Sequence, residues 1–69
     1  MEMKWHDDFC ISVKTENGTT QISANREGLL SLADFLTTLA DEQPGCHFHL
    51  DVWNALEDGS DELIVEKTR

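Results

Sequence analysis

Two tight-turn dipeptides, Asn17-Gly18 and Asp58-Gly59, mark two candidate hairpins in this chain of 69 residues. Asn-Gly between alternating residues is a strong hairpin signal, because both central positions of a type I′ turn need a positive φ, which Asn tolerates and Gly adopts freely. One helical segment separates the hairpins. A domain of this size buries only about 60% of the surface that its unfolded chain exposes, so one sheet face and one helix would complete the core.

The first hairpin is predicted from alternation on both sides of its turn. A period-two pattern of apolar and polar residues predicts a half-buried strand over about residues 9 to 14. Asp7 breaks the pattern, and we expect a bulge or a bend there. The returning strand is expected over residues 19 to 24. The alternating apolar residues before the turn are Trp5, Phe9, Ile11 and Val13.

A single amphipathic helix is predicted after Asn25, which stands at the N-cap position. The helix is expected to end near Asp41 or Glu42, because Pro44 cannot continue a helix and disfavours helical angles at Gln43. At about 100° per residue its apolar positions form one stripe that can cover a sheet face. The stripe comprises Leu29, Leu32, Ala33, Leu36, Leu39 and Ala40, with Leu30 and Phe35 on its flanks.

The second hairpin is expected to pair a third strand over CHFHLDVW, residues 46 to 53, with a last strand over about residues 62 to 67. The fold class is therefore α+β, with the order ββαββ in a single domain over residues 1 to 69. We predict a four-stranded antiparallel sheet with the helix packed on one face. Alternation would turn Phe48, Leu50 and Val52 toward the helix and place His47, His49 and Asp51 on the open face.

The charge of the chain limits its partners. Five Lys and Arg against fourteen Asp and Glu give a net charge of −9, which repels phosphate backbones and anionic lipid headgroups. We therefore predict no nucleic-acid binding and no membrane binding, and no apolar run approaches the roughly 18 residues of a membrane span. The N-terminus lacks a secretory signal pattern, which predicts a cytoplasmic protein. A basic protein partner would be steered toward such a surface.

The His47-x-His49-x-Asp51 run has three interpretations. Histidines at alternate strand positions can converge on a metal, with a carboxylate as the third ligand. However, side chains two residues apart stand about 6 to 7 Å apart along a strand, so His6, Asp7 or Asp8 would have to complete the site. A small metal-binding domain therefore stays the alternative, and the prediction is no metal and no cofactor.

Catalysis is the second interpretation, and the sequence argues against it. Hydrolytic chemistry needs a nucleophile or two tuned carboxylates in a pocket of about 300 Å³ or more, and one helix on one sheet offers no obvious place for one. Cys46 and His47 are neighbours on a strand, so their side chains would point to opposite faces. We predict that the protein is not an enzyme and has no catalytic residues.

Protein contact is the third interpretation, and it is preferred. Two imidazoles and an aromatic side chain can make buried contacts while carboxylates around them meet a basic partner. A homodimer through the open face is a further possibility. The predicted partner-binding residues are His47, His49, Asp51, Trp53, Glu57, Asp58, Asp61 and Glu62.

The segments ISANREGLLSLADFL and GCHFHLDVWNALEDGSDELIVEK resemble the small immunity proteins of bacterial polymorphic toxin systems, in particular the immunity protein thirty-two family. The likeness covers about residues 22 to 67. It implies a non-enzymatic cytosolic protein that binds and neutralises a cognate toxin. An acidic inhibitor would suit a basic nuclease, because its surface can occupy the groove that otherwise holds phosphates. The residues that carry the likeness are Asn25-Arg26-Glu27-Gly28, His47-x-His49-x-Asp51 and Gly59-Ser60-x-Glu62-Leu63.

Overall fold

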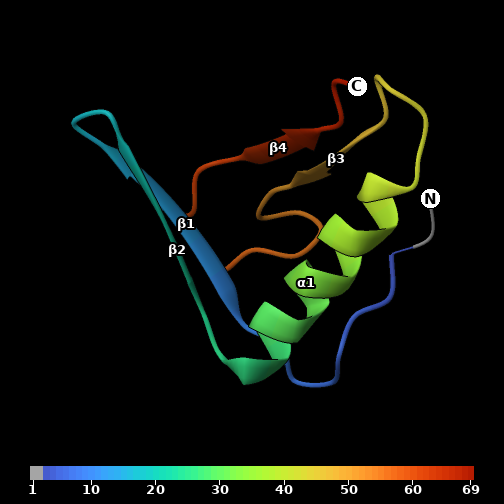
Figure 1. Cartoon of the computed structure of the whole chain (residues 1–69). Helices are drawn as coiled ribbons and strands as arrows, with labels where there is room; N and C mark the ends of the chain where they lie inside the picture. Colours follow the sequence, from blue (N-terminus) through green and yellow to red (C-terminus); the bar gives the residue numbers. More distant parts are fainter. Residues whose placement is uncertain (1–2) are drawn as a thin grey trace.

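The computed structural model describes residues 3 to 69 of the chain and contains one helix and two small antiparallel sheets (Figure 1). The element order ββαββ and the α+β class confirm the prediction. The predicted four-stranded sheet is wrong, because β1 pairs only with β2 and β3 pairs only with β4. The elements are β1 (Ile11–Glu16), β2 (Thr19–Ala24), α1 (Arg26–Ala40), β3 (His47–Leu50) and β4 (Leu63–Glu66).

The two sheets stay separate because residues 57 to 61, here called the edge loop, occupy the outer edge of β1. Backbone groups of β1 that point away from β2 bond to this loop instead of to a third strand. Two of the bonds use loop side chains, which a regular strand would not supply. The bonds run from Glu57 N to Ile11 O (2.9 Å), from Asp61 N to Val13 O (2.8 Å), from Val13 N to Ser60 Oγ (3.2 Å) and from Thr15 N to Asp61 Oδ2 (2.8 Å).

The first hairpin has the predicted turn. Asn17 and Gly18 have φ angles of 50° and 80°, so both central residues are left-handed, as a type I′ turn requires. β2 covers the predicted residues, whereas β1 begins at Ile11, two residues later than expected. The expected bend is also present, since Asp7 and Asp8 form a turn in which Asp8 has a φ of 61°.

Polar side chains bind the backbone at both ends of the helix. Asn25 is the N-cap, and its Oδ1 accepts hydrogen bonds from Gly28 N (2.8 Å) and Cys10 N (2.9 Å). At the other end Lys67 Nζ donates to the carbonyl oxygens of Ala40 (2.6 Å), the last residue of α1, and of Glu42 (2.7 Å), two residues beyond it. The cap at Asn25 is as predicted, and the helix ends at Ala40, next to the predicted residues.

The buried face of α1 is rotated from the predicted stripe. Leu32 and Leu39 are buried as expected, but Leu29 is 55% exposed and Leu36 is 49% exposed. Phe35, predicted on the flank, lies at the centre of the core instead. Trp5 explains the rotation, because its ring meets Phe35 edge-on at 4.6 Å and stacks on Phe9 at 4.4 Å, so the segment before β1 covers that side of the helix.

The core lies between α1 and the inner faces of the two hairpins. In β3, Phe48 and Leu50 are buried while His47 and His49, which alternate with them, are exposed, and this confirms the predicted alternation. The predicted third strand is too long, because β3 ends at Leu50. Val52 is exposed, and Leu56 completes the core instead. Among the described residues, no helix has the length and the apolar character needed to cross a membrane. The buried apolar residues are Ile11, Val13, Leu32, Phe35, Leu39, Phe48, Leu50 and Leu56.

Gly28 lies where α1 meets the first hairpin, and it generates a stability prediction. A Cβ at this position would lie 2.6 Å from Cys10 O and 2.9 Å from Ile11 Cγ1. Gly28→Ala should therefore destabilise the protein by about 1 to 3 kcal/mol through overpacking, although Ala is the better helix former. Chemical denaturation measures the change. Thr38→Ala, on an exposed position of the same helix, is the control and should not destabilise. A Gly28→Ala protein as stable as the wild type would contradict the close packing.

Candidate functional site

His47 and His49 lie side by side on the exposed face of the β3–β4 hairpin. Their ring centroids are 5.0 Å apart, with an angle of 58° between the ring planes. His47 Nδ1 lies 3.3 Å from Gly45 O, and His49 Nδ1 lies 3.5 Å from Glu62 Oε2. Across the hairpin, Ile64 lies opposite His49 and is 55% exposed. The face therefore combines imidazole, carboxylate and apolar groups.

Asp51 does not continue this face, because the strand has already ended. Its Oδ1 accepts hydrogen bonds from Trp53 N (2.9 Å) and Asn54 N (3.1 Å), and its carbonyl oxygen accepts from Leu56 N (2.9 Å). Such a side chain that binds its own downstream backbone forms an Asx turn, which competes with the strand. The turn redirects the chain. The expectation that Asp51 lies on the open strand face is thus wrong, and its role in partner binding stays a prediction.

Trp53 projects from this turn into solvent, with 92% of its surface exposed. Its backbone is fixed by Asp51, but the ring takes no part in the core. Tryptophan is highly buried on average in folded proteins, and exposed apolar groups that gather on a surface mark interaction sites. Val52, next to it, is also exposed. The most exposed large apolar side chain of the described residues therefore stands among the predicted partner-binding residues.

The acidic residues around the edge loop divide into two kinds. Glu57 Oε1 accepts a hydrogen bond from Cys10 Sγ (3.0 Å), directly before β1, and Asp61 Oδ2 accepts one from Thr15 N of β1, so both carboxylates attach the loop to this part of the first hairpin. Asp58 makes no hydrogen bond or ion pair with any residue from 3 to 69, and Glu62 has only the exposed contact to His49. The predicted acidic residues are thus close in the chain, but they differ in what they do.

The two cysteines are free, with Cys10 exposed and Cys46 half-buried. The hydrogen bond to Glu57, partial loss of hydration and the negative charge of the same carboxylate all raise the pKa of the Cys10 thiol. A raised pKa keeps the thiol protonated at neutral pH, whereas a nucleophilic cysteine needs a lowered one. Cys10 therefore lacks the lowered pKa that a nucleophilic cysteine needs.

The residues that the metal interpretation needs do not assemble. His6 Nε2 pairs with Asp34 Oδ2 of α1 at 2.9 Å, and Asp8 lies in the turn before β1. Neither is brought beside His47 and His49. Within residues 3 to 69 no group of three or more His, Cys, Asp or Glu side chains is placed to hold a metal ion. The geometry thus offers no support for the alternative of a metal-binding domain.

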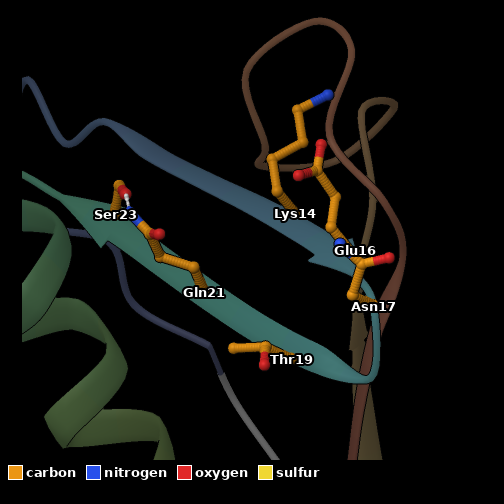
Figure 2. A pocket seen from close by; sticks show the side chains of 6 residues that line it. All are labelled: Lys14, Glu16, Asn17, Thr19, Gln21 and Ser23. Carbon is orange, nitrogen blue, oxygen red and sulfur yellow. Dashed lines mark hydrogen bonds between the residues drawn. The ribbon is translucent and has the colours of Figure 1, made fainter.

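A hollow on the outer face of the first hairpin was not indicated by the sequence pattern (Figure 2). It has a volume of about 420 Å³, and its six lining side chains are all polar or charged. Lys14 Nζ donates to Gly59 O, which adds a further tie to the edge loop, and Gln21 Nε2 donates to Ser23 Oγ at 3.1 Å. The lining residues are Lys14, Glu16, Asn17, Thr19, Gln21 and Ser23. They supply no nucleophile with an adjacent base, and so the hollow does not resemble an active site.

The division of the acidic residues can be tested by removing one carboxylate of each kind. Asp61→Ala removes the acceptor of the Thr15 amide at an exposed strand edge and should lower the free energy of unfolding by about 0.5 to 1.5 kcal/mol, the net contribution of a typical hydrogen bond. Asp58→Ala removes the same charge without breaking a bond and should change stability by less than about 0.5 kcal/mol. Denaturant titration measures both, and hydrogen exchange of the Thr15 amide should accelerate only in Asp61→Ala. Equal effects of the two variants would contradict the anchoring role of Asp61.

Comparison with known proteins gives one match. The sequence model of the family described as Immunity protein 32 matches residues 19–68, which include β2, α1, β3, the edge loop and β4. No curated protein and no solved structure gives a significant match. The matched region is the larger part of the chain and agrees with the resemblance seen in residues 22 to 67. This chain therefore belongs to the Immunity protein 32 family.

Proposed function

We propose that this protein neutralises a cognate bacterial toxin by binding it directly, with Trp53 at the centre of the contact. Membership of an immunity protein family supports the toxin-neutralising role. The observation that carries the choice of surface is the 92% exposure of Trp53, on a turn beside the edge loop and the histidine pair. An exposed tryptophan of this kind is a typical hot spot, because it can bury a large area in a pocket of the partner.

The turn that carries Trp53 favours tight binding. Asp51 and Asn54 bond to each other's backbone, with Asp51 N donating to Asn54 Oδ1 at 2.8 Å, and Asn54 Nδ2 donates to His49 O at 2.9 Å. The backbone under the ring is therefore fixed before any partner arrives. A preorganised aromatic anchor loses only its side-chain torsions on binding, so less conformational entropy opposes the complex.

Charge supports a toxin with a basic binding surface. The chain carries a net charge of −9, and Asp58 and Glu62, which follow Trp53 within ten residues of the sequence, are both exposed. A nuclease toxin fits this chemistry, because its substrate groove must attract phosphates and would equally attract a carboxylate-rich inhibitor. In this proposal His47, His49, Asp58 and Glu62 form the polar rim around Trp53.

The remaining predicted contact residues mainly fix the shape of the loop and of the turn. Asp51 and Asp61 each bind a backbone N–H group through a carboxylate oxygen, and Glu57 accepts a hydrogen bond from the Cys10 thiol, so their first role is to shape the surface. We propose no catalytic role for any of them, and inhibition would follow from occupying the toxin rather than from changing it chemically. The proposal places the protein in the cytoplasm, where free thiols such as Cys10 and Cys46 stay reduced.

Removing the anchor should separate binding from stability. Trp53→Ala is expected to weaken binding to the cognate toxin domain by about 30- to 1000-fold, the effect of a hot-spot residue. The free energy of unfolding should change by less than about 0.5 kcal/mol, because the ring is almost fully exposed. Calorimetry with a catalytically inactive toxin domain measures the affinity, and growth under toxin co-expression measures protection.

Thr37→Ala, on the exposed side of α1, is the control for this measurement and should bind as the wild type does. Unchanged affinity and full protection by Trp53→Ala would refute the proposed surface. Failure of the wild-type protein to bind or protect against that toxin would refute the proposed function itself.

The electrostatic part of the proposal concerns the association rate. Between about 0.05 and 0.5 M salt the Debye length falls from above about 10 Å to below about 5 Å, so the rate of toxin association should fall steeply. Asp58→Lys should slow association at low salt and flatten this dependence, whereas Asp7→Lys, which makes the same change of charge in the turn before β1, should do so less. Stopped-flow fluorescence of Trp53 measures the rates. A salt-insensitive rate would contradict a basic toxin surface.

A further inference from the structure

The outer edge of β2 is open, whereas the outer edge of β1 is covered. Ile11, Val13 and Thr15 turn their backbone groups away from β2 and toward the edge loop. Their antiparallel neighbours in β2 are Ala24, Ile22 and Thr20, and these must therefore turn their backbone groups away from β1. No strand of the described chain lies on that side (Figure 1). A row of backbone donors and acceptors is left facing solvent.

The open edge has none of the usual protection. Natural edge strands avoid pairing with other chains through charged residues, proline, bulges or a covering element. β2 reads TTQISA, six residues without a charge or a proline, and it pairs with β1 without a bulge. Five of its six residues are exposed. Such an edge is suited to main-chain pairing with another strand.

An exposed apolar stripe on α1 accompanies this edge. Leu29, Ala33, Leu36 and Ala40 are all exposed, and at about 100° per residue they lie within roughly 60° of one another on the helix. The flank on the other side of the buried face carries Ser31 and Asp34, and the segment before β1 contacts both of them through His6, although Asp34 stays exposed. Only Asn25 separates β2 from α1, and Ile22 on the inner face of β2 is itself 42% exposed.

We propose that a second copy of this chain binds here, with the two β2 strands pairing antiparallel across a two-fold axis. Ile22 of one copy then lies opposite Ile22 of the other, and Thr20 lies opposite Ala24, so every outward backbone group meets an outward partner. The four strands β1-β2-β2-β1 form one continuous sheet. Both helices lie on the same face of that sheet, because the axis is perpendicular to it, and their apolar stripes come together.

The charge distribution favours a second copy as the occupant. Two chains of net charge −9 repel each other, so a self-contact must form where neither copy carries charge. Residues 19 to 24 and the four stripe residues are all uncharged. This patch offers a basic partner no electrostatic attraction, and such a partner is attracted instead to the acidic side chains around the edge loop. Main-chain pairing of one strand is a small contact, and the stripe supplies the additional apolar area that a stable interface needs.

Sedimentation equilibrium of the full chain tests this proposal. The wild type should be a dimer at micromolar concentrations, and the dimer should strengthen with added salt, because salt screens the repulsion between the two copies. Leu36→Glu should make the protein monomeric. Thr37→Glu adds the same charge to the adjacent helix position, outside the stripe, and should remain dimeric. Ile22→Lys, which would place two ammonium groups opposite each other, should also be monomeric.

Circular dichroism must show that each variant is folded, and Leu36→Glu carries the test if Ile22→Lys does not fold. A wild type that stays monomeric up to about 100 μM, or a dimer that survives both Leu36→Glu and Ile22→Lys, would overturn the proposal. A monomeric wild type that loses toxin binding in Ile22→Lys would also overturn it, and would assign the edge to a strand of the toxin. Trp53→Ala should leave the dimer intact, so the two proposals can fail separately.

Discussion

The hydrogen bonds between the edge loop and β1 determine how the rest of the molecule is arranged. They attach residues 57 to 61 to β1, which lies more than 40 residues earlier in the chain. These bonds also provide partners for outward-facing backbone groups of β1 that could otherwise pair with a third strand. With that edge filled, the second hairpin packs as a separate sheet across the core. The same contacts bring Leu56 into the core and hold the acidic residues at the surface.

Local sequence signals predicted the elements, because each depends on a few neighbouring residues. Asn17-Gly18 fixed the first turn, Asn25 marked the helix start, and alternation in β3 separated the buried from the exposed residues. The arrangement of the sheets was not predictable in the same way. The bonds of Ser60 Oγ and Asp61 Oδ2 to β1 are side-chain contacts across the fold, and they leave no period in the sequence. The rotation of the helix likewise depends on Trp5, whose packing is tertiary.

The candidate surface was predictable in part for the same reason. Exposure of His47 and His49 followed from alternation, which is local. For Asp51, alternation was overridden by a turn that its own side chain creates. Composition grouped Glu57, Asp58, Asp61 and Glu62 as one acidic segment, but only their contacts distinguish the carboxylates that hold the loop from those that remain available. Net charge describes the electrostatic potential of a surface, but it does not show which carboxylates form structural hydrogen bonds.

Between residues 51 and 62, residues whose hydrogen bonds fix the backbone are interspersed with residues whose side chains are free of this role. Asp51 and Asn54 fix the backbone around Trp53, and Glu57, Ser60 and Asp61 fix it around Asp58. Substitutions at the available positions alter the outer surface without removing a bond on which the fold depends. In the proposed function, recognition and folding are thereby encoded by different residues of the same short segment. Under that proposal, single substitutions can adapt the contact surface to a changed partner while the scaffold stays the same.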